Sequence, residues 1–509
     1  GGDLNFDVNL QNVYKVSFVS NISNARDFKV EVYKDGKLIE AEEDGSYLLT
    51  NGKYTYKASA TGYAQIDKEF EVSSNELAIT VEFETSYDTS WYDSTKTSFE
   101  ISNAKQLAGL GAIVNGYTNI SDNFSGKTIT ITSDINVDKV LSEWLPIGTS
   151  QKKFAGIFDG QNHTITLNIN QPDTEYVGLF SILTSSTQVK NVIVDGTITG
   201  KDHVAGIAGY GDWYRALENC VNKATITGEK YVGGILGDQG TYQVYTNNCA
   251  NKGKVTGKEA VGGICGYLRQ AYISNCYNEG EVTGETSVGG IGGLGVSTCY
   301  LMNCYNTGTI TGTKSDTGGI VGNANYSYVT NMYNTGTVIG VDYVGGIAGK
   351  GSTNGINNSY NTGDIKASGN YVGGVVGITG NSGASKVSNC YNTGSVTPSE
   401  TSTNVGVVAG AGNIENCYYI NTFTNYTDNQ GEAFTQEDFE NGNLAKKLND
   451  NLSLGYKIWG VKDKTTTFTD NSIQKSFDVY NQSNNNKIKD YTIELKDSEG
   501  NVVKPYNEG

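Results

Sequence analysis

Six tyrosines that recur at one position of a repeated unit are the residues whose spacing points most directly to binding. Each follows a small residue that is usually cysteine, as in Cys304-Tyr305. If that small residue points into a core, the alternation of a β-strand turns the tyrosine outward. A row of phenol rings could then bind sugar rings or a protein partner, or the rings could pack on one another and cover the sheet. The predicted ligand-binding row is Tyr277, Tyr305, Tyr333, Tyr360, Tyr391 and Tyr418.

Residues that could catalyse a reaction or bind a metal are scarce. The two histidines, His163 and His203, lie in neither an HExxH motif nor a Ser/His/Asp pattern, and we interpret both as structural or solvated. No CxxC pair is present, the cysteines of the repeat row lie a full repeat apart, and Cys265 and Cys299 lie off that row, so no zinc site is expected. The Gly-Gly pairs recur in every unit, which indicates corners rather than phosphate-binding loops. We predict no catalytic residue, no metal and no cofactor.

Charged residues gather just before each Val-Gly-Gly block, as in Glu229-Lys230 and Lys258-Glu259. Their sign changes from one unit to the next, which is typical of a solvated edge rather than a catalytic site. Because polysaccharide lyases and hydrolases also use β-helices, with acids and bases gathered on one face, a carbohydrate-active enzyme is the alternative interpretation.

The elements that position these residues follow from a fixed repeat. The residues that open each unit are 27 to 29 apart over eight units, followed by one gap of 33. Each unit has three short apolar segments divided by Gly and Asn, and none has the longer 3.6-residue pattern that a helical repeat needs. The sequence predicts an all-β, right-handed parallel β-helix of three-strand coils. The opening residues are Val177, Val204, Val232, Val261, Val288, Thr317, Val344, Val372 and Val405.

Two further positions of the unit predict what stacks between coils. An asparagine recurs from Asn191 to Asn416, and in-register asparagines can hydrogen-bond along a stack. The next position accepts Val, Cys, Met and Ser, which indicates a small, buried site where Cys acts as a hydrophobe. We therefore predict buried free thiols, stacked in consecutive coils, at Cys220, Cys249, Cys276 and Cys304.

The blocks of Val-Gly-Gly-Ile followed by Asn-Cys-Tyr-Asn-Thr-Gly resemble the GLUG-repeat family of bacterial surface proteins. The match covers about residues 175 to 418. The resemblance implies a secreted, wall-attached or adhesin-like protein with a β-helical stalk. It implies no single activity, because these repeats occur in adhesins and also beside protease modules. The zinc motif of those proteases is absent from this sequence.

Composition limits the partners of the chain. Its 509 residues carry a formal net charge of −17, which argues against nucleic acid and anionic membranes as partners. No stretch approaches the roughly 18 apolar residues of a membrane span. The start at Gly1-Gly2, without Met, favours an excised piece of a longer exported protein. We expect a monomer.

Composition shifts divide the chain into modules. Alternating strands and regular turns near the N-terminus resemble an immunoglobulin-like or PEGA-like sandwich. A helix beginning near Ser102, with Leu107, Leu110 and Ile113 on one face, should cap the solenoid, and Thr435 to Asp438 resembles a capping box. The predicted modules are 1–86 (β-sandwich), 87–97 (linker), 98–175 (cap and entry coils), 176–420 (repeats), 421–465 (C-terminal cap) and 466–509 (start of a second, truncated sandwich).

These observations predict a non-enzymatic adhesin or stalk segment at the bacterial cell surface or cell wall. Its expected partner is a host surface protein or a glycan, with no nucleic acid and no membrane insertion. The alternative is a carbohydrate-active β-helix, either a polysaccharide lyase or a hydrolase.

Overall fold

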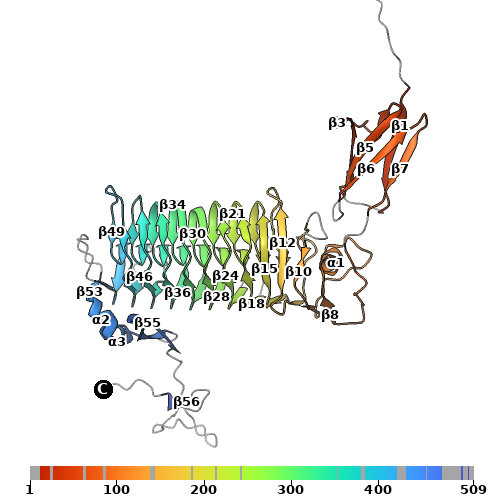
Figure 1. The fold of residues 1–509 in the computed structure, drawn as a ribbon. Helices are drawn as coiled ribbons and strands as arrows, with labels where there is room; N and C mark the ends of the chain where they lie inside the picture. Colours follow the sequence, from red (N-terminus) through yellow and green to blue (C-terminus); the bar gives the residue numbers. More distant parts are fainter. Residues whose placement is uncertain are drawn as a thin grey trace, which may run out of the picture. The chain divides into compact units, whose positions relative to one another are not determined.

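The computed structural model describes residues 12–22, 27–60, 63, 65–83, 87–137, 144–184, 187–211, 215–240, 244–351, 354–379, 385–420, 431–453, 456–472, 495–496 and 502–503. The chain divides into two units, Gly1–Asp438 and Phe439–Gly509, and each is described by itself. The first unit contains a small N-terminal pair of sheets and a long stack of parallel strands (Figure 1).

The stack confirms the predicted parallel β-helix. One coil contains β26 (Glu259–Gly262), β27 (Cys265–Leu268), β28 (Ala271–Ser274) and β29 (Tyr277–Asn278). Equivalent strands pair in parallel and in register, so that Val261 lies between Val232 and Val288 of the neighbouring coils. Each coil therefore buries its apolar side chains against the coils before and after it.

Three sheets run along the stack in the described part of the chain. The 25-stranded sheet runs from β10 (Ile135–Asn136) to β53 (Glu432–Phe434), and the 12-stranded sheet runs from β51 (Asn413–Glu415) to β8 (Ser98–Ile101). The nine-stranded sheet runs from β13 (Phe180–Leu183) to β50 (Ala409–Ala411). Residues such as Ile264 fill the space between the sheets and are 0 % exposed.

The predicted asparagine row, here called the outer asparagine row, occupies a corner of each coil. Its members have a left-handed backbone, with φ of 57° at Asn303 and at Asn331, a conformation that asparagine tolerates better than most residues. The side chains also bond along the stack, because Asn331 Nδ2 donates to Asn303 Oδ1 at 2.8 Å. The outer asparagine row is Asn191, Asn219, Asn248, Asn275, Asn303, Asn331, Asn358, Asn389 and Asn416.

A second row, the inner asparagine row, was not singled out in the sequence and is fully buried. Asn306 Nδ2 donates to Asn334 Oδ1 at 2.7 Å and to the Gly308 carbonyl at 2.8 Å. These bonds satisfy polar groups that would otherwise be costly inside the core. The inner asparagine row is Asn222, Asn251, Asn278, Asn306, Asn334, Asn361 and Asn392, each 0 % exposed.

The prediction of buried free thiols is confirmed, and the structure adds a reason for the residue types at this position. The backbone N–H of Cys249 donates to Cys276 Sγ at 3.4 Å, and that of Met332 donates to Ser359 Oγ at 3.0 Å. The position therefore takes a small side chain that can accept a hydrogen bond, which Cys, Met and Ser all provide. Burial raises the pKa of the Cys276 thiol well above its ordinary value, so the thiol is unreactive in the folded state.

Thiol titration checks this arrangement. In denaturant without reductant, we expect all eight cysteines to react, and in the native protein we expect almost none to react within the same time, because all eight are buried free thiols. Recovery of no thiols, which would mean four disulfides, contradicts the stacked-thiol arrangement.

A helix lies at the N-terminal end of the stack. Helix α1 (Ala104–Asn115) begins after Asn103, whose side chain accepts a hydrogen bond from Gln106 N, and ends at Gly116 with φ of 76°. Leu107 and Leu110 are 0 % exposed and join the core of the first coils. Capping positions of this kind protect an end where strands and core would otherwise be open.

No α-helix in the described ranges has the length and apolar character that a bilayer crossing requires.

The N-terminal sheets enclose a core of their own, which includes Val16, Val32 and Val81 at 0 % exposure. The three-stranded sheet has the order β4 (Tyr47–Leu49), β1 (Tyr14–Ser20), β7 (Leu77–Val81). The four-stranded sheet has the order β3 (Lys37–Ile39), β2 (Lys29–Lys34), β5 (Gly52–Ser59), β6 (Ile66–Val72).

Near the end of the first unit, Thr435 and Asp438 form the expected capping box. Asp438 N donates to Thr435 Oγ1 at 3.2 Å, and Thr435 N donates to Asp438 Oδ2 at 3.0 Å. Thr435 and Asp438 thereby cap the start of α2 (Gln436–Asn441).

In the second unit, α3 (Asn443–Asn449) precedes the hairpin of β54 (Lys457–Lys462) and β55 (Thr465–Ser472). Most of the predicted second sandwich, including Ser476-Phe477 and Tyr491 to Glu494, lies outside the described residues, as do residues 421–430 of the predicted cap. Within residues 466–509, the described strands are most of β55, β56 (Leu495–Lys496) and β57 (Val502–Val503).

Candidate functional site

The tyrosine row predicted from the sequence, here called the inner tyrosine row, forms a stack on the 25-stranded sheet. Tyr305 lies 5.0 Å from Tyr277 and 4.8 Å from Tyr333 between ring centroids, with the planes within 5°. Burial raises the pKa of the Tyr333 hydroxyl. Since the ring faces lie on one another, this row presents ring edges rather than open faces. Its first three members are half-buried, and the buried members are Tyr360, Tyr391 and Tyr418, each at most 5 % exposed.

A second set of tyrosines, here called the outer tyrosine ladder, was missed in the sequence and is more exposed. Successive ring centroids are 4.9, 4.7 and 4.9 Å apart. The two end rings, Tyr245 and Tyr328, are 43 % and 39 % exposed. The signal that could have found the ladder is a tyrosine three residues before the outer asparagine in four consecutive coils. The ladder is Tyr245 on β23 (Val244–Asn247), Tyr272 on β28, Tyr300 on β32 (Cys299–Met302) and Tyr328 on β36 (Ser327–Thr330).

Register explains where the ladder ends. Tyr245 pairs with Ala216 of the preceding coil, so the ladder has no ring there. At the other end, Val329 pairs with Ile356, which places Gly355 opposite Tyr328. The other ladder rings therefore cover only one face of Tyr328, whose second face could stack on a sugar ring or another flat ligand.

The surface beside the ladder is uncharged. The register places one side chain from each of the same four strands in a parallel column, and every one is neutral. Charged residues appear in that column only farther along, at Glu218 before the ladder and at Glu415 after it. An uncharged aromatic strip differs from the rest of this acidic chain and indicates a face for a ligand bound by hydrogen bonds and ring contacts. The neutral column is Asn247, Ser274, Met302 and Thr330.

A second arrangement missed in the sequence, here called the acid–base cluster, comprises His203, Asp238 and Arg269. His203 Nδ1, on β16 (Asp202–Ala205), lies 3.3 Å from Asp238 Oδ2, on β22 (Leu236–Gln239). Arg269 Nη2 lies 3.8 Å from the same oxygen. Asp238 is 1 % exposed, and neither its Oδ1 nor His203 Nδ1 has a hydrogen-bond partner among the described residues, so the two groups make an electrostatic contact. A buried carboxylate beside an imidazole can orient that ring as a general base.

Tyrosines enclose this cluster. The His203 ring lies between Tyr176, with centroids 4.4 Å apart, and Tyr231, with centroids 4.9 Å apart. The Arg269 guanidinium stacks over Tyr267 at 4.6 Å. Burial first, and then nearby acids including Asp238, raise the pKa of the Tyr176 hydroxyl. With both ring faces covered, the exposed 13 % of the His203 side chain lies at the ring edge. Of the two roles predicted for His203, structural or solvated, this enclosed position fits the structural one.

The same corner holds a comparable ion pair in later coils but without a histidine. Lys350 Nζ lies 2.9 Å from Asp316 Oδ1, and Asn323 Nδ2 donates to Asp316 Oδ2 at 3.0 Å. Lys350 also lies over the Tyr343 ring at 4.2 Å from its centroid. This pair provides a matched comparison for the acid–base cluster, because it has the buried carboxylate and the cation without the base.

The charged edges predicted from the sequence form exposed ion pairs between coils. Lys258 lies 2.7 Å from Glu229, with the two side chains 55 % and 45 % exposed. Exposed pairs of this kind contribute little to stability. His163 Nδ1 lies 3.2 Å from Asp134, whose side chain is 75 % exposed. These residues fit the predicted solvated role.

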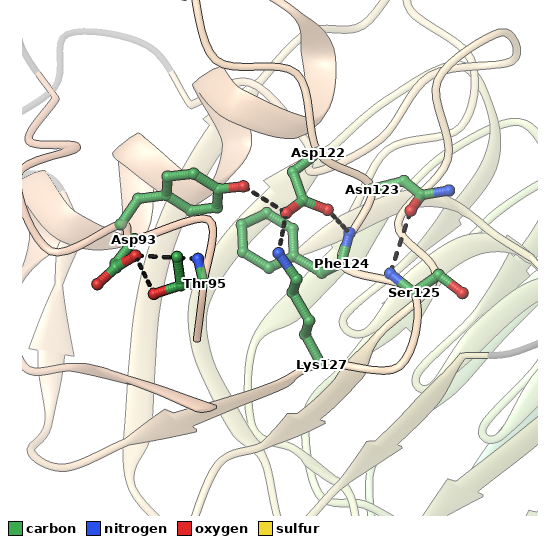
Figure 2. A network of polar contacts seen from close by, with 8 residues as sticks. Asp93, Thr95, Asp122, Asn123, Phe124, Ser125 and Lys127 are labelled. Atoms are coloured by element: carbon green, nitrogen blue, oxygen red, sulfur yellow. Dashed lines mark hydrogen bonds and ion pairs between the residues drawn. The ribbon is translucent and has the colours of Figure 1, made fainter. Parts of the chain in front are cut away.

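A polar network lies near the N-terminal cap (Figure 2). Figure 2 shows Asp122 between Lys127 and the backbone of Phe124, whose N–H donates to Asp122 Oδ1 at 2.7 Å. The Tyr92 hydroxyl donates to Asp122 Oδ2 at 2.6 Å. Burial acts to raise the pKa of Asp122, but the hydrogen bonds from Lys127, Tyr92 and Phe124 outweigh it and hold that pKa below its ordinary value.

A hollow of about 320 Å³ adjoins this network and is lined by residues that include Asp122 and Lys152. An ionised Asp122 with three partners is poorly suited to donate a proton, so we assign the network a structural role. No group of three or more His, Cys, Asp or Glu side chains in the described ranges is placed to hold a metal ion.

Comparisons with known proteins reveal only remote likenesses. No family model matches the chain, and no curated protein does. One similar solved structure, from Bacteroides ovatus, is described as a candidate immunoglobulin A1 protease. It has 18 % identity and a TM-score of 0.31 and covers 75 % of this chain and 95 % of its own. Another is an IgA1 protease with 13 % identity and a TM-score of 0.32, and the match covers 84 % of this chain and 31 % of that protein.

These names contradict the prediction of a non-enzymatic adhesin or stalk, because both similar structures are named as enzymes. The sequence also missed the acid–base cluster. The sequence places His203 beside charged corner residues, whereas folding brings it to a buried carboxylate on the next coil. At these TM-scores the likeness does not assign a protease activity to this chain. The β-solenoid fold is shown by the parallel register of the strands themselves.

Proposed function

We propose that the chain is the polysaccharide-binding solenoid of a carbohydrate-active enzyme, with the substrate chain held along the outer tyrosine ladder. The observation that carries this proposal is the ladder itself. It places four tyrosines in consecutive coils on an uncharged face, with both end rings well exposed.

The spacing of the ladder suits a linear polymer of sugars. One hydroxyl-bearing ring edge recurs every 4.7 to 4.9 Å, which is close to the length of one pyranose residue in an extended chain. The edges can exchange hydrogen bonds with sugar hydroxyls, and the exposed side chains of Tyr245 and Tyr328 can contact sugar rings. A polymer lying along the stack would meet one equivalent contact per residue.

The finer identity of the chain belongs to the same proposal. The repeat motif supports membership of the GLUG-repeat group, and the N-terminal sheets support an immunoglobulin-like module. Both suit a monomeric protein that acts outside the cell at a bacterial surface, with a glycan as its partner.

The test is to replace both end rings, Tyr245→Ala together with Tyr328→Ala, and to measure binding by affinity electrophoresis through gels that contain soluble polysaccharides. Each ring contributes about 1 kcal/mol, so the double variant should bind roughly 30-fold more weakly. Both residues are partly exposed, so the fold should persist, and circular dichroism checks that it does.

The paired variant Tyr305→Ala with Tyr333→Ala discriminates between the two sets of tyrosines. If that variant loses binding and the end-ring variant keeps it, the inner tyrosine row is the site. If the wild-type chain is not retarded by any polysaccharide and instead cleaves an added protein substrate, the proposed function is wrong.

A further inference from the structure

We infer that the acid–base cluster is a catalytic centre that cleaves uronate-containing polysaccharides by β-elimination, an inference that rests on the proposed function. Its three groups come from three consecutive coils: His203 from β16, Asp238 from β22, and Arg269 just after β27. They supply a base, an acid that orients the base, and a cation.

The geometry favours elimination over hydrolysis. Glycoside hydrolysis generally uses two carboxylates on opposite sides of the bond, separated by roughly 5 to 9.5 Å. The cluster contains a single carboxylate, Asp238, which is buried and already engaged by His203 and Arg269. Elimination needs instead a base for a proton α to a carboxylate and a cation for the charge that develops there.

His203 and Arg269 fit these two roles. Because His203 Nδ1 lies 3.3 Å from Asp238 Oδ2, we assign the other ring nitrogen, Nε2, as the base. The Arg269 side chain is 34 % exposed, so its guanidinium can reach a uronate carboxylate while still resting on Tyr267. Asp238 does not contact the substrate in this scheme and is a positioning residue.

The reaction balances without an added co-reactant. His203 Nε2 removes the proton from C5 of the uronate, and the freed electron pair forms the C4–C5 double bond. The C4–O4 bond breaks, and its electron pair leaves on O4, which takes a proton from water. His203 then returns its proton to the hydroxide formed. Arg269 stabilises the negative charge that builds up on the carboxylate during proton removal.

The experiment supplies polygalacturonate, alginate and chondroitin sulfate to the full chain and follows the ultraviolet absorbance of the unsaturated product. We expect wild-type turnover on at least one polymer and a loss of about 100-fold or more in kcat for His203→Ala. Added imidazole should restore part of the activity of that variant, which a purely structural role of His203 would not allow. Asp238→Asn and Arg269→Lys should also lower kcat, since lysine lacks the planar fork of arginine.

Asp316→Asn is the matched control, because it disrupts a buried carboxylate–cation pair at the same corner without touching a histidine. It should retain wild-type turnover. Equal loss of activity in Asp316→Asn and Asp238→Asn would overturn the inference, as would the absence of imidazole rescue. Absence of unsaturated product from every polymer would also overturn it. If the wild-type chain is still retarded in the polysaccharide gels, the proposed binding function stands by itself.

Discussion

Replacing Asn306 with alanine is expected to destabilise the solenoid by about 3 kcal/mol or more. Asn306 is 0 % exposed and accepts a hydrogen bond from Asn278 Nδ2 at 2.7 Å. It donates in turn to Asn334 Oδ1 and to the Gly308 carbonyl. Removing the amide takes a hydrogen bond from each of three buried polar partners, of which Asn278 Nδ2 keeps its bond to the Gly280 carbonyl. Each unpaired group costs about 1–3 kcal/mol.

Urea unfolding followed by circular dichroism measures this effect. The matched control is Asn275→Gly in the outer asparagine row, where the side chain is exposed and glycine keeps the left-handed backbone, with φ of 55° in the wild type. It loses one exposed bond to Asn247 and should change stability by less than about 1 kcal/mol. Equal destabilisation by the two variants would show that the buried row has no special role.

Replacing Gly308 with alanine should have a still larger effect, about 4 kcal/mol or more, because it forces two coils apart. An added Cβ would lie 2.1 Å from the Gly280 carbonyl oxygen of the preceding coil and 2.8 Å from the Gly280 carbonyl carbon. Both atoms belong to the backbone and are held by the hydrogen bonds that set the coil spacing. The chain therefore cannot make room by changing a rotamer.

Limited proteolysis and urea unfolding should show early opening near this coil. Gly292→Ala is the control, because it makes the same substitution in the same stack. Its added Cβ would lie 2.5 Å from the end of the Leu268 side chain, and the next atoms are 3.6 Å or more away. That side chain can move, so the control should cost no more than about 1–3 kcal/mol. A Gly308→Ala variant as stable as the Gly292→Ala control would mean that the coils can separate freely.

The repeat architecture could be predicted from the sequence because it depends on local chemistry that recurs in every coil. Asparagine suits the left-handed corner at Asn303, and small apolar residues suit the stacked core position at Cys304. The capping helix near Leu107 follows from its own apolar face and its asparagine cap. Each of these signals lies within a single unit. Their recurrence at a fixed period indicates the fold class.

The functional surfaces were decided only by the tertiary structure. Tyr300 and Tyr305 occur in the same unit and look equivalent in sequence, yet they belong to the 12-stranded and 25-stranded sheets. Whether such a ring is open or covered depends on what lies opposite it in the adjacent coil and on what packs over that sheet. His203 and Asp238 meet because a left-handed corner, with φ of 57° at His203, brings two sheets together across neighbouring coils. Contacts between coils depend on register and corner angle, which no single unit of the sequence encodes.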